Sequence, residues 1–163
     1  MPDCGVPGSA IAGSDGFNTI ANSGAITSDA TAIDIDSGGN RIVNDGIITS
    51  RFQSGIDLGA DGVGSEVVNN NKIVADDYGV RILGTESILV NTGEIVAEAS
   101  DGVLVDEARY VMNSGAISGD ETGMSLTGED YRVVNTGTVD GEARGVELFQ
   151  TSQNSSTEVV FIN

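Results

Sequence analysis

The sequence contains no histidine and no tryptophan, and it has 2 prolines, a single cysteine and only 4% aromatic residues. Without histidine, Cys4 has no partner for a Cys/His metal site or a Cys/His nucleophile, and alone it forms no internal disulfide. No stretch approaches the roughly 18 consecutive apolar residues of a transmembrane helix, so we expect no membrane insertion. Sites built on histidine or on disulfides are therefore excluded.

Positive charge is also scarce, because 7 Lys and Arg stand against 25 Asp and Glu, a net charge of −18. Such a surface repels phosphate backbones, so we expect no nucleic-acid partner. Apolar residues still make up 39%, too many for a disordered acidic tail. We treat residues 1–163 as a single domain, with 1–9 as an N-terminal segment that caps the fold, 10–160 as its repeats and 161–163 as a C-terminal edge.

Asparagine recurs about every 22 residues. The column is Asn22, Asn44, Asn69, Asn91, Asn113 and Asn135. We predict a structural role, in which each amide hydrogen-bonds to the next repeat or to turn backbone. Two residues later stand Gly24, Gly46, Asn71, Gly93, Gly115 and Gly137. Because asparagine is the residue that best tolerates glycine's left-handed conformation, the exception at Asn71 predicts a left-handed turn in this column.

Apolar residues fill the rest of each repeat at period two. An isoleucine or valine follows each turn, as at Ile26, and an apolar–x–apolar triplet follows a small mid-repeat residue, as at Ile33 and Ile35. An apolar pair such as Ile42-Val43 precedes the next asparagine. Period-two alternation predicts three short strands per repeat and leaves no segment for a helix. Loops at 60–64 and 150–156 interrupt this frame.

A single repeat cannot bury its own apolar face, so the repeats must stack, each strand pairing in parallel with its equivalent at about 4.8 Å. The handedness of parallel crossovers favours a right-handed winding. The sequence therefore predicts an all-β fold, a right-handed parallel β-helix (β-solenoid) of about seven coils of roughly 22 residues, with three short strands per coil.

The Asn-x-Gly-x-Ile repeats over residues 8–160 resemble those of bacterial autotransporter passenger domains and related secreted right-handed β-helix proteins. This resemblance is more specific for fold than for activity. It implies a bacterial protein that is secreted or exposed at the cell surface.

Asp34, Asp57 and Arg81 occupy the solvent-facing position of successive triplets. Many right-handed β-helices act on acidic polysaccharides, and such sites need carboxylates beside a basic partner. These residues are therefore the candidate catalytic group of a polysaccharide lyase, hydrolase or epimerase. The alternative is an ordinary solvated strand face on which Arg81 neutralises its neighbours.

A second acidic column lies seven residues after each asparagine. It reads Asp29, Arg51, Asp76, Glu98, Asp120 and Glu142. Arg51 offsets the repulsion between like charges at one end of the column, but no basic residue does so between Asp76 and Glu142. The carboxylates of Asp76, Glu98, Asp120 and Glu142 are therefore candidates to bind a cation such as Ca²⁺. The alternative is a solvated corner with splayed side chains, and we expect no other cofactor.

The apolar run at the end of the chain, Val159 to Ile162, predicts a strand edge that pairs with another copy end to end. Together these features favour a non-enzymatic structural module outside the cell or on its surface, serving in adhesion, matrix or filament formation. A polysaccharide or another cell-surface ligand is the expected partner besides a second copy. The alternative function is the carbohydrate-active enzyme.

Overall fold

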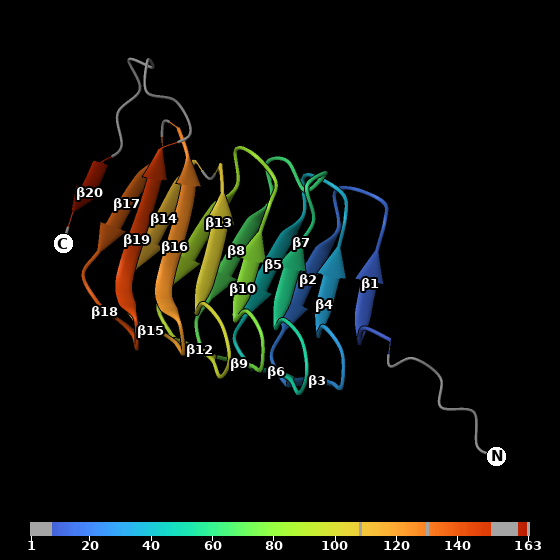
Figure 1. Ribbon diagram of the computed structural model, residues 1–163. Helices are drawn as coiled ribbons and strands as arrows, with labels where there is room; N and C mark the ends of the chain where they lie inside the picture. Colours follow the sequence, from blue (N-terminus) through green and yellow to red (C-terminus); the bar gives the residue numbers. More distant parts are fainter. Residues whose placement is uncertain (1–7, 108, 130, 151–159, 163) are drawn as a thin grey trace.

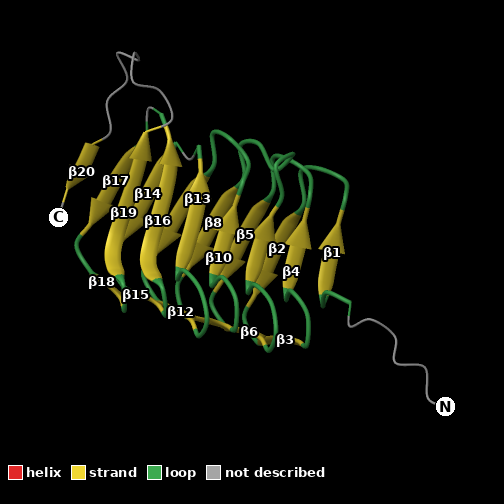
Figure 2. Ribbon diagram, in the orientation of Figure 1, coloured by secondary structure: helices red, strands yellow, loops and turns green. Residues whose placement is uncertain are grey.

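The computed structural model describes residues 8–107, 109–129, 131–150 and 160–162. These residues form strands, turns and bends, without a helix. Three parallel sheets run along a rod (Figures 1 and 2), with sheet B behind sheet A and sheet C below. Sheet A contains β1 (Ile11–Gly13), β4 (Ile33–Ile35), β7 (Ile56–Leu58), β10 (Val80–Ile82), β13 (Val103–Asp106), β16 (Thr122–Gly128) and β19 (Arg144–Gln150).

Sheets B and C supply the other two strands of each coil. Sheet B contains β2 (Thr19–Asn22), β5 (Arg41–Asn44), β8 (Glu66–Asn69), β11 (Ile88–Asn91), β14 (Tyr110–Asn113), β17 (Arg132–Asn135) and β20 (Val160–Ile162). Sheet C contains β3 (Ala25–Ser28), β6 (Ile47–Ser50), β9 (Lys72–Ala75), β12 (Glu94–Ala97), β15 (Ala116–Gly119) and β18 (Thr138–Gly141).

The predicted parallel β-solenoid with three strands per coil is confirmed. Strands β1 to β18 form six complete coils, and β19 and β20 form two sides of a seventh. The right-handed winding remains a prediction. The insertion at 60–64 lies in a loop between β7 and β8, while most of the second insertion, 151–156, lies outside the described residues.

The core is built from columns of equivalent residues. In sheet A, Ile33 pairs with Ile56 and Val80 with Val103, and these side chains are fully buried. In sheet B, the first residue of each apolar pair is buried, as at Ile42, whereas the second, as at Val43, faces outward and is half-buried. Each coil therefore contributes one side chain per column to a continuous apolar interior.

The asparagine column is a buried hydrogen-bonded ladder. From Asn22 to Asn113, each side-chain amide donates to the side-chain oxygen of the next asparagine at 2.8 Å. Each of these amides also donates to the backbone of the next coil, as Asn91 does to the Ala116 oxygen at 3.2 Å. Because the middle of the ladder is fully buried, its amides stabilise the corner only if the coils stay in register.

The prediction of a left-handed turn two residues after each asparagine is wrong. None of these residues has φ in the left-handed region, which applies to Gly24, Gly46, Asn71, Gly93, Gly115 and Gly137. Their glycines are explained by close stacking instead, because a Cβ on Gly115 would collide with the backbone oxygen of Gly93. Where Asn71 carries a Cβ, Lys72 N lies 3.3 Å from Gly46 O, against 2.8 Å between Ala116 N and Gly93 O.

The left-handed conformation lies at another corner, between sheets A and B. One residue of each of the first six coils has a positive φ there, namely Phe17, Gly39, Gly64, Glu86, Glu107 and Gly128. Half of this column is not glycine. A left-handed conformation costs a residue with a Cβ roughly 1–2 kcal/mol, so Phe17, Glu86 and Glu107 are held there by the pairing of the strands on either side.

Candidate functional site

The triplet column of sheet A brings the candidate catalytic residues together. Asp57 is paired with Asp34 on one side and with Arg81 on the other. The Arg81 guanidinium donates to both carboxylate oxygens of Asp57, from Nε to Oδ1 at 3.0 Å and from Nη2 to Oδ2 at 2.5 Å. Asp57 is 8% exposed, which makes this ion pair the most protected of those in the described residues.

Two residues of the neighbouring corner surround this ion pair. Arg81 lies over the ring of Tyr78, 5.7 Å from its centroid. The hydrogen bond from Arg81 to Asp57 raises the pKa of the guanidinium further above its ordinary value. Burial raises the pKa of Asp77, and the nearby carboxylate of Asp57 adds to this rise while Arg81 opposes it. The cluster is therefore electrostatically coupled, with one cation shared among carboxylates.

Asp34 is held differently from Asp57. Its Oδ2 accepts a hydrogen bond of 3.1 Å from the Ser9 hydroxyl, and it lines a hollow of about 270 Å³ with Ser14 and Asp36. Within the described part of the chain, one oxygen of Asp34 accepts a hydrogen bond, whereas both oxygens of Asp57 accept from Arg81. General acid–base chemistry requires a carboxyl group that can take up and release a proton. Because both Asp57 oxygens already accept hydrogen bonds from Arg81, this carboxylate suits a structural role.

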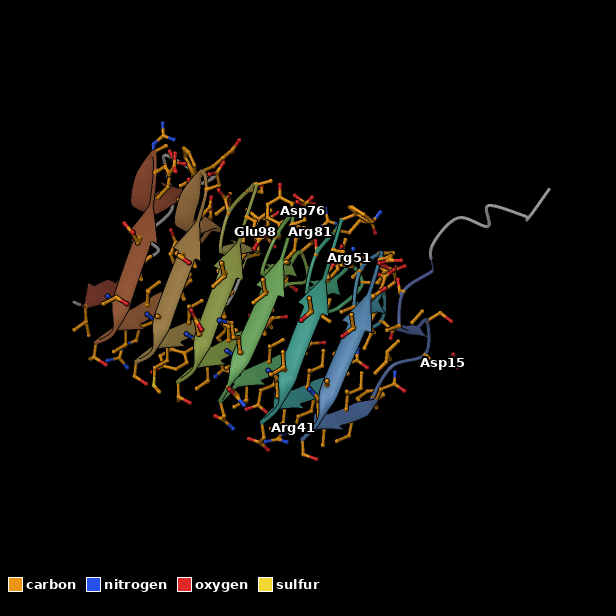
Figure 3. All side chains as sticks on the ribbon, turned by 90° about the horizontal axis from the view of Figure 1, so that it is seen from below. Asp15, Arg41, Arg51, Asp76, Arg81 and Glu98 are labelled. Carbon is orange, nitrogen blue, oxygen red and sulfur yellow. The ribbon has the colours of Figure 1, made fainter. Side chains whose placement is uncertain are left out.

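The second acidic column follows the corner between sheets C and A. Figure 3 shows Arg51, Asp76 and Glu98 along this edge, with Arg41 on the opposite side of the rod. Arg51 pairs with Asp29 at 3.1 Å, as expected from their neighbouring positions. Across the described residues, no group of three or more His, Cys, Asp or Glu side chains is arranged to hold a metal ion. Cation binding by Asp76, Glu98, Asp120 and Glu142 therefore stays a prediction.

A hollow that the sequence pattern did not reveal lies at the C-terminal part of the same corner. It measures about 530 Å³ and is lined by Asp101, Asp120, Glu121, Thr122, Glu142, Ala143, Arg144 and Glu147. Burial raises the pKa of Asp101, although the Thr122 backbone N–H donates to its Oδ1 at 3.0 Å. Asp101 and Glu121 belong to no repeating column, so periodicity alone could not assign them to one site.

Comparison with protein-family models, with curated proteins and with solved structures finds no match to this chain. The similarity to autotransporter passengers therefore rests on the repeat pattern alone. Among the described residues, no helix is long and apolar enough to span a membrane. Cys4 lies outside the described residues.

Proposed function

We propose that this protein is a non-enzymatic structural solenoid of the autotransporter-passenger type, secreted by a bacterium or exposed on its surface, where it serves in adhesion, matrix or filament formation. The observation that carries the proposal is the unbroken register of the stack. The asparagine ladder links Asn22 to Asn135 without a gap, so the chain forms a rigid spacer. A rod with a net charge of −18 resists nonspecific aggregation and presents long, regular faces.

End-to-end stacking is the assembly that the repeat suits. Strand β20 pairs with β17 in the same parallel register that the earlier strands of sheet B use. A strand of another copy could therefore pair with β20 in that register. Negative-stain electron microscopy and light scattering of the purified chain at high concentration test this assembly. Filaments that grow along the rod axis are expected. A monodisperse monomer would count against end-to-end pairing.

The alternative function is a carbohydrate-active enzyme, and the register of Asp34, Asp57 and Arg81 on adjacent strands favours it. We expect no cleavage or epimerisation of pectate, alginate or another acidic polysaccharide, because the Arg81 ion pair occupies Asp57. The test is product formation by the wild-type chain beside Asp57→Ala. Turnover that disappears in Asp57→Ala would replace the structural proposal with the enzymatic one.

A further inference from the structure

The outward face of sheet B carries an apolar stripe. In each apolar pair the second residue points away from the core, and register aligns these residues as Val43, Val68, Val90, Met112 and Val134. Each of these side chains is half-buried. The stripe is therefore a continuous apolar surface on the outside of a strongly acidic protein.

The strands that carry the stripe have almost no net charge of their own. The strands of sheet B carry the charges of Arg41, Glu66 and Arg132, and the adjoining turns to sheet C add that of Asp45. By contrast, the corner between sheets C and A carries the acidic column and the acidic hollow. Two copies that meet through sheet B would keep these C–A corners apart, which lowers the repulsion between two molecules of net charge −18.

Arg132 provides a second, independent observation. Every other Arg and Lys side chain is paired with a carboxylate, whereas Arg132 is exposed and makes no ion pair within the described residues. It stands in the outer column of sheet B that also contains Glu66, Ile88 and Tyr110. Arg132 is therefore an exposed cation at the rim of the apolar stripe that is available to a carboxylate of a second molecule.

We propose that sheet B is the interface of a two-fold symmetric dimer of this chain, with its axis parallel to the strands and between β11 and β14. This rotation reverses the order of the coils in the second copy, and each column of one copy faces the same column of the other. It places Arg132 of one copy opposite Glu66 of the other, and Val90 opposite Met112. Glu66 then lies between its own Arg41, at 2.8 Å, and the Arg132 of the second copy. An axis centred on β11 itself would instead oppose Arg41 and Arg132, two like charges.

The size of the face sets the expected affinity. Six strands at about 4.8 Å and four residues at about 3.3 Å give a contact of about 30 Å by 13 Å, or roughly 400 Å² per copy. Stable interfaces bury about 800 Å² per copy, roughly twice this area, so we expect the dimer to be weak. Because a two-fold interface uses the same surface on both partners, assembly stops at two copies, unlike end-to-end stacking, which continues.

The test is sedimentation equilibrium of the full chain from about 10 μM to 1 mM in 0.15 M salt. Wild type is expected to dimerise, and Val90→Asp to raise the dissociation constant at least tenfold. The matched control is Val96→Asp, an outward, half-buried valine on β12 of the same coil, which should leave dimerisation unchanged. Circular dichroism verifies that both variants remain folded.

Charge exchange tests the register separately. Arg132→Glu and Glu66→Arg should each raise the dissociation constant at least fivefold, and the double variant should restore it to within about threefold of wild type. A monomer throughout the concentration range would overturn the proposal. Equal effects of Val90→Asp and Val96→Asp, or a double variant no better than either single one, would also overturn it.

Discussion

Asn91→Ala is the substitution that tests the asparagine ladder at its centre. The Asn91 amide donates to the Asn113 side-chain oxygen at 2.8 Å and to the Ala116 backbone oxygen at 3.2 Å, and its oxygen accepts from Asn69 at 2.8 Å. The side chain is fully buried. Alanine therefore removes these bonds where no water replaces them.

The expected loss follows from these contacts. The two ladder bonds are each worth about 1 kcal/mol net, and the buried Asn113 oxygen left without its donor costs about 1–3 kcal/mol more. We expect the free energy of unfolding to fall by about 3–5 kcal/mol. With a urea m-value of about 2 kcal/mol/M, the unfolding midpoint falls by roughly 1.5–2.5 M. Urea titration followed by far-ultraviolet circular dichroism measures this change.

The matched control is Asn70→Ala, one residue beyond the ladder. Asn70 is exposed and bonds to Asp45 at 2.7 Å and to Thr92 at 3.1 Å, so its loss should cost less than about 1 kcal/mol. The m-values of both variants must match that of wild type for the midpoints to be compared. If Asn91→Ala costs no more than Asn70→Ala, the ladder does not stabilise the stack.

Four further predictions test other parts of the stack, the first three by urea titration. Gly115→Ala should lower the free energy of unfolding by about 2 kcal/mol, because the added Cβ collides with the backbone of the preceding coil. Gly24→Ala should be nearly neutral, because nothing lies within 4 Å of its added Cβ. Equal losses in the two variants would refute the stacking argument. Tyr131→Phe should stabilise by about 1–2 kcal/mol, because it removes a buried hydroxyl that has no hydrogen-bond partner among the described residues. A loss of stability would contradict this reasoning. Glu86→Gly should stabilise by about 0.5–1 kcal/mol by relieving a left-handed φ of 58°. Burial raises the folded-state pKa of Asp77, so ionised Asp77 opposes folding. In thermal melts at pH 7, Asp77→Asn should therefore be more stable than wild type. This difference in stability should vanish as the pH falls below 3.8, where Asp77 is protonated in both the folded and the unfolded state. A pH-independent difference would contradict that cause.

The fold was predictable because it depends on columns that keep one chemical character. Isoleucine and valine at period two, interrupted by asparagine every 22 residues, leave stacked parallel strands as the arrangement that buries them. The triplet column was predictable for the same reason, and it places Asp57 beside Arg81 as the spacing indicates. The chemical character of each column and the spacing of the repeat together determine which residues become neighbours.

Backbone conformation and the orientation of apolar pairs were less predictable. The left-handed column mixes Phe17, Glu86 and Glu107 with glycines, so it has no compositional signal. The column of five glycines and Asn71 beside the ladder reflects close stacking instead. An apolar pair such as Ile42-Val43 does not reveal which member faces the core. Pairing with neighbouring coils decides both features, and a single repeat lacks that information.

The stacking register itself can be measured most directly by nuclear magnetic resonance, through proton contacts between backbones of successive coils. The structure predicts contacts that link Ile73 to Ile95 and Ile95 to Ile117, with the parallel pattern of sheet C. Contacts shifted by one residue, an antiparallel pattern, or helical contacts between residues three and four apart would contradict the stacked solenoid.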